Sequence, residues 1–341
     1  MLIVRPIQHE DKEAILGFAK AAGVGHTNLP DNERELQAKI DHSELSFNTH
    51  LDQAGEESYQ FVLENTGTQE LAGTCAIDAC VGLSEPNYSY RLSTLVHASK
   101  DLKMVNRVLA LHLSHDYTGV SRLSAFYLHP DYRHSFYDQL LSKARLMFMA
   151  CFPERFSGTT IAEIKGVLNA KDSSPFWDSL GRHFFAMDFA EADSLSGTSN
   201  KSFIADLMPR HPVYVPLLPA AAQEVIGQHN EDFEDIVNIL EHEGLQFMDQ
   251  VDIFDAGPIL EARTRLIRTI RQVQQAEVVI NDDTARDNTT PSVKALLSNN
   301  RCQEFRCVLG NLSTDGKVYL TAEEAKALAL LPNQHILVAP L

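Results

Sequence analysis

The sequence predicts an α/β protein in which helices flank a mixed β-sheet. An apolar strand, Leu123–Leu128, runs through a basic turn into a helix whose apolar side chains recur at helical spacing. Residues 58–64 and 71–81 alternate as two strands around a turn that contains Gly67. The 341 residues, 44% of them hydrophobic, suffice for more than one core.

The first elements follow the same alternation. Leu2–Pro6 is a predicted strand, and the helix after it carries Ile15 on its apolar face and ends at Gly23. A loop rich in turn formers leads to a second helix that begins near Asp31. Residues 88–97 are a further predicted strand. We therefore expect helices on both faces of the sheet.

Another helix begins downstream of this unit. Ser174 is its predicted N-cap and Pro175 its first residue. We expect this helix to end at Gly181 and to lead into an aromatic strand, His183–Phe189. Residues 203–208 fit a short strand or a helix equally well.

The pattern of helix, glycine and aromatic strand recurs later in the chain. A helix is predicted over 231–243, and a strand over 245–254 follows Gly244. Two instances suggest a second lobe that resembles the first half. The predicted units are residues 1–195, residues 196–270 as the second lobe, and residues 271–341.

The last unit is predicted to be small and rich in strands. Residues 276–300 are polar and irregular, with an exposed loop over 281–291. Short alternating segments follow, and Thr321 and Glu324 form a capping box at the start of a helix. The predicted strands cover residues 305–309, 318–320 and 334–339.

Composition excludes several classes of partner. A net charge of −17 is opposite to the basic surface that nucleic acids require. No apolar run approaches the ~20 residues of a membrane span, and the first six residues do not read as a signal peptide. The cysteine spacing lacks the partners of a zinc site, so we expect no metal and a cytoplasmic protein. The five expected free thiols are Cys75, Cys80, Cys151, Cys302 and Cys307.

The basic turn after Leu128 is the first candidate binding site. Arg133 and His134 precede the helix, and Lys143 and Arg145 follow within it. Free N–H groups at a helix N-terminus favour anions, so the turn is a predicted phosphate site. An ordinary exposed helix remains an equal alternative for Lys143 and Arg145.

Several strings together identify a family. Their order and spacing resemble arginine N-succinyltransferases and the related arginine/ornithine succinyltransferase subunits, and the order of elements resembles GNAT acyltransferases. The match extends from Arg5 to about Pro258. The strings are residues 95–99, 140–143, 147–150, 174–181, 201–205, 207–212 and 251–258.

The resemblance implies a GNAT-like fold and transfer of a succinyl group from succinyl-CoA to the α-amine of L-arginine. The amine attacks the thioester directly, so succinyl-CoA is a cosubstrate and no cofactor is bound permanently. A strand should offer N–H groups to the thioester and pantetheine, and the following turn should face the pyrophosphate. The expected residues for CoA are Ala125, Phe126, Tyr127, Leu128, Arg133, His134 and Lys143.

Two positions depart from the family pattern. Phe136 and Asp138 stand where family members usually carry glycines in the turn. The family's proton donor is a histidine after Val-Ile-Gly-Gln; here His229 follows this string directly, and an ungapped count places Asn230 at the donor position. We assign His229 as the catalytic residue. The alternative is that Asn230 is a helix N-cap and His229 lies beside it on the surface.

A cationic substrate requires acidic or polar side chains. The expected residues for arginine are His26, Asn28, Glu163 and Asp252, with Asp255 as the alternative to Asp252; each could instead be an ordinary turn or strand-edge residue. We expect a homo-oligomer or a hetero-oligomer with a related subunit. The alternative functions are acyl transfer to ornithine or another amine, and a catalytically silent partner subunit.

Overall fold

The computed structural model describes residues 1–341 except 26–27, 134, 199–206, 210, 281–290 and 331–334. The described strands pair in the order β14-β11-β15-β12-β13-β1-β2-β3-β6-β7-β10-β9-β4-β5-β8. They are β1 (Leu2–Pro6), β2 (Ser58–Asn65), β3 (Leu71–Asp78), β4 (Ser89–Ser99), β5 (Met104–Ser114), β6 (Ser121–Leu128), β7 (Thr159–Glu163), β8 (Val213–Tyr214), β9 (Gln246–Val251), β10 (Pro258–Arg263), β11 (Gln274–Ile280), β12 (Ser292–Ser298), β13 (Cys307–Ser313), β14 (Lys317–Leu320) and β15 (Ile336–Pro340).

The sheet is mixed, as predicted. Among the described strands, β6 pairs with β7 and β11 with β14 in parallel, and the other pairs are antiparallel. The helices are α1 (Lys12–Ala22), α2 (Glu33–Asn48), α3 (Phe136–Cys151), α4 (Pro175–Ser179), α5 (Gly181–Phe185), α6 (Phe189–Thr198), α8 (Ala220–Val225), α9 (Glu234–His242), α10 (Arg268–Gln272) and α11 (Ala322–Ala327).

Helices cover both faces of the central strands, and the pleat of β2 explains why. Val62 points to the face that α1 and α2 cover, whereas its neighbours Phe61 and Leu63 point to the α3 face. On the α3 side, the ring centroid of Phe148 lies 5.2 Å from that of Phe61 and 5.2 Å from that of Phe305. Each buried phenylalanine contributes about 1.5–3 kcal/mol. The C-terminal strands are thereby joined to the core around α3.

One predicted strand is wrong. The aromatic run 183–189 forms α5 and the start of α6, with Ala186 left-handed between them at φ 54°. Phe185 and Phe189 are both buried in the cluster around Trp177. The two residues stand in different short helices, and nothing in the apolar pattern marks the left-handed break at Ala186, so the pattern alone does not reveal these helices. The prediction for residues 203–208 falls largely outside the described residues.

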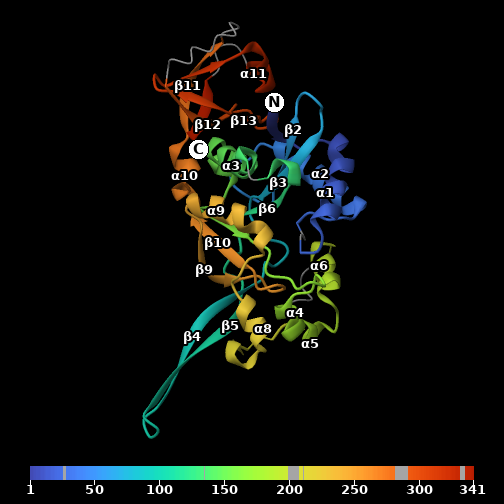
Figure 1. Ribbon diagram of the computed structural model, residues 1–341, viewed down its shortest axis with the longest axis vertical. Helices are drawn as coiled ribbons and strands as arrows, with labels where there is room; N and C mark the ends of the chain where they lie inside the picture. Colours follow the sequence, from blue (N-terminus) through green and yellow to red (C-terminus); the bar gives the residue numbers. More distant parts are fainter. Residues whose placement is uncertain (26–27, 134, 199–206, 210, 281–290, 331–334) are drawn as a thin grey trace.

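Two strand regions were missed. β5 pairs with all of β4, and the two form a ribbon that projects from the lower end of the elongated molecule in Figure 1. The region 276–300, expected to be irregular, contains most of β11 and all of β12. The exposed loop predicted over 281–291 lies outside the described residues except for Pro291. Residues 246–251 form a strand as predicted, and Thr321 caps α11 through a capping box.

The strands of the predicted second lobe extend the central sheet. β10 pairs antiparallel with β7, and β9 pairs with β10 and with β4. The lower end of the molecule has its own cluster of buried apolar residues around Trp177. The bounds of the three predicted units stay a prediction.

The turn between β9 and β10 is packed tightly against the end of β7. A Cβ atom added at Gly257 would lie 2.1 Å from the carbonyl oxygen of Ile164 and 2.6 Å from the backbone nitrogen of Gly166. We expect Gly257→Ala to lower the free energy of unfolding by about 1–3 kcal/mol, because backbone must move. Urea denaturation measures the change. Gly158→Ala, where a Cβ meets nothing within 4 Å, is the matched control; equal stability of the two variants would contradict this packing.

Candidate functional site

The site begins where two parallel strands separate. β6 and β7 pair only from Ser121 to Leu123, opposite Thr160 to Ala162. Beyond that point Ala125 and Phe126 together oppose a single residue of β3, which is a β-bulge, and Ala125 has φ 50°. The β7-facing edge of β6 after Leu123 therefore pairs with no strand among the described residues. Ligands of α/β sheets bind at such carboxyl ends of parallel strands.

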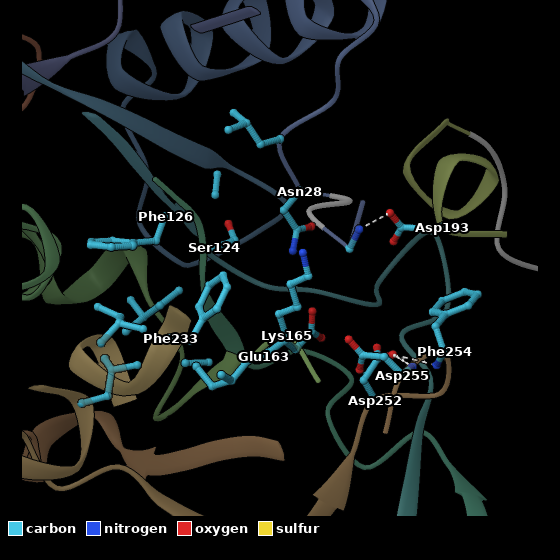
Figure 2. Close-up of a pocket in the computed structure, with 18 of the residues that line it drawn as sticks. Asn28, Ser124, Phe126, Glu163, Lys165, Asp193, Phe233, Asp252, Phe254 and Asp255 are labelled. Atoms are coloured by element: carbon cyan, nitrogen blue, oxygen red, sulfur yellow. Dashed lines mark hydrogen bonds between the residues drawn. The ribbon is translucent and has the colours of Figure 1, made fainter. Parts of the chain in front are cut away.

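A central cavity of about 100 Å³ occupies this gap. Both strands and the loops around them supply its walls, so residues far apart in sequence meet there (Figure 2). The polar and charged side chains that line it are Asn28, Ser124, Arg145, Glu163, Lys165, Asp193, Asp252 and Asp255. The cavity thus brings together Ala125, Phe126, Asn28, Glu163 and Asp252 of the predicted site.

Two aspartates lie side by side on one wall (Figure 2). One oxygen of Asp252 accepts hydrogen bonds from the backbone N–H groups of Phe254 at 2.6 Å and Asp255 at 3.1 Å. Asp255 accepts from the N–H groups of Gly166 at 2.7 Å and Gly257 at 2.8 Å. These backbone donors hold both carboxylates in fixed orientations at the edge of the cavity.

The environment of these acids favours their neutral forms. Burial, followed by the charges of Asp255 and Glu163, raises the pKa of Asp252 to about 7. Burial also raises the pKa of Asp255. A carboxyl that titrates near neutrality can exchange a proton with a substrate, or can pair with a cation that enters.

The other charged groups of the cavity are partly compensated. Glu163 accepts a hydrogen bond from Arg122 at 3.0 Å, and Arg122 also binds Asp78 at 3.0 Å. Burial lowers the pKa of Lys165, and the nearby carboxylates of Asp193 and Asp255 oppose this effect. In Figure 2 the side chain of Lys165 extends toward Asn28, with Glu163 beside it.

Two further cavities lie beside the basic turn. The second, about 120 Å³, is lined by Arg133 and by Phe126–Leu128, and it shares Phe126 and Lys165 with the central cavity. Arg133 Nε donates to the carbonyl of Leu128 at 3.1 Å, which fixes the turn to the end of β6. The third, about 980 Å³, lies between α3, α9 and β12, and its cationic lining residues are Lys143, Arg268 and Lys294.

The helix start between these cavities is capped by its own side chains. The hydroxyl of Ser135 accepts from the N–H of Tyr137 at 3.1 Å, and Asp138 accepts from the N–H of Ser135 at 3.0 Å. Phe136 is 46% exposed, and the ammonium of Lys294 lies 3.3 Å from its ring centroid. Asp138, at a family glycine position, therefore supplies one half of a capping box.

His229 lies beside the central cavity but is not one of its lining residues. Its backbone bridges to Gly166, and the N–H of Asn230 donates to the carbonyl of Lys165 at 2.9 Å. Its Nε2 atom lies 2.8 Å from a carboxylate oxygen of Glu234. The side chain of Asn230 accepts from the N–H of Asp232, so this residue is an N-cap, as the alternative reading expected.

The other predicted residues are dispersed. Lys143 is buried and its ammonium lies 3.1 Å from Glu243, in the wall of the third cavity. Tyr127 and Leu128 line the second cavity. His26 and His134 lie outside the described residues. Sequence reasoning did not name Lys165 or Asp193 at all. The alternation of charged and apolar residues in Glu163-Ile-Lys165, at the end of a buried strand, could have indicated Lys165 as a site residue.

Comparison with known proteins shows to which family the chain belongs. The family model for the arginine N-succinyltransferase beta subunit matches residues 2–269. The chain belongs to the arginine N-succinyltransferase family. It is 43% identical to the arginine N-succinyltransferase of Yersinia enterocolitica over 343 residues, covering 100% of this chain and 98% of that protein. With the Escherichia coli protein the identity is 41%, covering 96% and 94%.

A solved structure supports the fold over the whole chain. The arginine/ornithine succinyltransferase subunit AI from Pseudomonas aeruginosa aligns with a TM-score of 0.91 at 39% identity. The alignment covers 100% of this chain and 98% of that one. The chain is therefore an acyltransferase of α/β fold, as the resemblance implied.

The described residues contain neither a cluster of metal ligands nor a membrane-spanning helix. No three or more His, Cys, Asp or Glu side chains in the described ranges are placed to hold a metal ion together. None of the helices in the described part of the chain is long and apolar enough to cross a membrane. All five cysteines are free thiols, as predicted.

The raised pKa of Asp252 predicts a pH-dependent stability. Folding favours the protonated acid, so its contribution to stability is full below the unfolded pKa of 3.8 and is lost as the pH rises through about 7. We expect Asp252→Asn to gain stability relative to wild type between pH 5 and 8, by on the order of 2 kcal/mol. Chemical denaturation across this pH range measures the change.

Asp249→Asn, on the exposed part of the neighbouring strand β9, serves as the control and should keep the wild-type pH trend. A constant difference between Asp252→Asn and wild type at every pH would contradict the proposed environment of Asp252.

Proposed function

We propose that this chain transfers the succinyl group of succinyl-CoA to the α-amine of L-arginine. The observation that carries the proposal is the gap between β6 and β7, with the bulge at Ala125, in a chain of this family. The unpaired edge of β6 suits a thioester, because its backbone N–H groups can stabilise the oxyanion that forms when the amine attacks. The acidic lining of the same cavity suits a cationic acceptor.

The thioester arm of CoA would follow β6. The edge Ala125–Leu128 borders both the central and the second cavity, so one extended ligand can contact all four residues. Arg133 lies at the far end of this path and would meet the pyrophosphate. Lys143 and the third cavity would lie beside the nucleotide part of CoA. The assignment of His134 to CoA stays a prediction from the sequence. No cofactor other than this cosubstrate is needed for direct attack.

The amine would enter from the acidic wall. Asp252, Glu163 and Asn28 face the cavity and would bind the cationic groups of arginine. The α-ammonium of the substrate first gives one proton to water. The nitrogen lone pair then bonds to the thioester carbon, the nitrogen gives its second proton to water, and the carbon–sulfur bond breaks. The departing thiolate takes a proton from His229, which Glu234 orients through a hydrogen bond and which regains a proton from solvent.

The proposal includes an oligomeric assembly and a cytoplasmic location. The β4–β5 ribbon exposes Val96, Met104 and Val105, and this apolar surface supports the predicted assembly with another copy or a related subunit. A cytoplasmic location is consistent with free cysteines and with substrates of central metabolism.

The proposal is tested by following the release of free CoA thiol. We expect release with succinyl-CoA and arginine together, and little release when either is absent. Parallel reactions with ornithine identify the alternative acceptor, which the Pseudomonas aeruginosa relative's name suggests. No release with any amine, together with no thermal stabilisation by succinyl-CoA, would instead support a silent partner subunit.

The role of His229 has its own test. His229→Gln should lower kcat by roughly 100-fold, because general acid catalysis of that size is lost, with little effect on KM for either substrate. The matched control is His50→Gln, an exposed histidine outside the three cavities. Undiminished turnover by His229→Gln would remove this residue from the mechanism and leave the fold unaffected.

A further inference from the structure

Arg145 is an unusual residue for a buried position of a helix. It lies on α3, is 2% exposed, and lines the central cavity together with the bulge residues Ala125 and Phe126. Its guanidinium carbon lies 5.6 Å from the centroid of the Phe126 ring. A guanidinium stays charged in proteins, so a full positive charge is buried at the wall of the proposed acyl site.

The hydrogen bonds of Arg145 involve only neutral partners. It donates to the carbonyl of Ser142 at 3.1 Å, to the hydroxyl of Ser142 at 3.2 Å and to the carbonyl of Ser124 at 3.4 Å. Among the described residues, no carboxylate lies within ion-pair distance of Arg145. Burial without a counter-ion lowers the pKa of Arg145. The buried positive charge of Arg145 therefore has no counter-ion among the described residues.

The other buried or largely buried arginines show the contrast. Arg5 pairs with Asp11 at 2.7 Å, and Arg122 binds both Asp78 and Glu163. Arg155 lacks a carboxylate, but it donates to carbonyls at the C-terminal end of α2, where the helix dipole is negative. Among these residues, only Arg145 lines the central cavity.

An uncompensated buried charge is costly, and an anion in the cavity would offset that cost. The proposed donor brings such an anion. The acyl group of succinyl-CoA ends in a carboxylate, separated from the thioester carbonyl by two methylene groups. Arg145 contacts Ser124, the residue immediately before the bulge that would hold that carbonyl.

We propose that Arg145 binds the free carboxylate of the succinyl group and thereby selects the acyl donor. This inference rests on the proposed function. A planar guanidinium can hold a carboxylate through two parallel hydrogen bonds, which a neutral acyl chain cannot form. Lys165, the other cation of the cavity, lies among Asp193 and Asp255 and belongs to the wall that receives the amine.

The cavity thus divides its charges between the two substrates. The cation on α3 faces the anionic donor, and the carboxylates of β7, α6 and the β9–β10 turn face the cationic acceptor. This arrangement separates recognition of the acyl chain from recognition of the amine.

The test compares kcat/KM for succinyl-CoA and butyryl-CoA, which has the same number of acyl carbons and no carboxylate, with arginine as the acceptor. Wild type should prefer succinyl-CoA by about 100-fold or more, because a polar site left unpaired rejects the neutral chain. Arg145→Met should reduce this ratio to within about 10-fold, mainly through lost turnover of succinyl-CoA. Arg145→Lys should keep an intermediate ratio. Lys165→Met, the matched control, should leave the ratio as in wild type.

Three results would overturn the inference: equal use of both donors by wild type, equal loss of both donors in Arg145→Met, or collapse of the ratio in Lys165→Met. The wild-type comparison needs no variant, so it holds even if Arg145→Met fails to fold. Absence of turnover with every donor would overturn the proposed function itself, and is distinguishable from equal use of both donors.

Discussion

The site depends on a loss of backbone pairing between two adjacent strands. β6 and β7 run parallel for three residue pairs, and the bulge at Ala125 then turns the β6 edge away from a partner. Unpaired backbone groups inside a protein are costly unless a ligand or water satisfies them. A left-handed alanine adds about 1–2 kcal/mol of strain. The surrounding core, α3 on one face and α1 and α2 on the other, holds this arrangement in place.

The charges around the gap follow from this geometry. Because β7 ends beside the β9–β10 turn, the loop that carries Asp252 and Asp255 meets the end of β7 at Gly166. Because α3 packs beneath β6, Arg145 reaches the same cavity from the opposite side. Two substrates of opposite charge can therefore meet at one strand edge. The negative net charge of the whole chain does not predict the charges of the central cavity, where cations and carboxylates lie on different walls.

Much of the fold could be predicted, because many segments repeat their apolar residues with either the helical or the strand period, but not both. The helix after Leu2–Pro6, the hairpin around Gly67 and the capped helix at Thr321 belong to this class. The strand predicted for the aromatic run 183–189 was wrong because its apolar pattern does not mark the left-handed break at Ala186 that separates two short helices. The bulge at Ala125 could not be predicted, because Ser-Ala-Phe-Tyr reads as an ordinary strand and the extra residue is visible only against β3.

Individual site residues could be predicted from the sequence, but their grouping around one cavity could not. Asn28, Glu163 and Asp252 were each assigned from residue type, and tertiary structure brings them together with Arg145 and Lys165, whose roles depend on which acids lie near them. Asp138, where the resemblance led us to expect a glycine, instead completes a helix cap with Ser135, which a comparison of residue types alone does not reveal.

Amide hydrogen exchange with a non-reactive thioether analogue of succinyl-CoA tests the central idea most directly. If the acyl donor lies along the edge of β6, exchange at residues 125–128 should slow when the analogue is bound. Protection confined to the cavity between α3, α9 and β12, with exchange along β6 unchanged, would contradict the account.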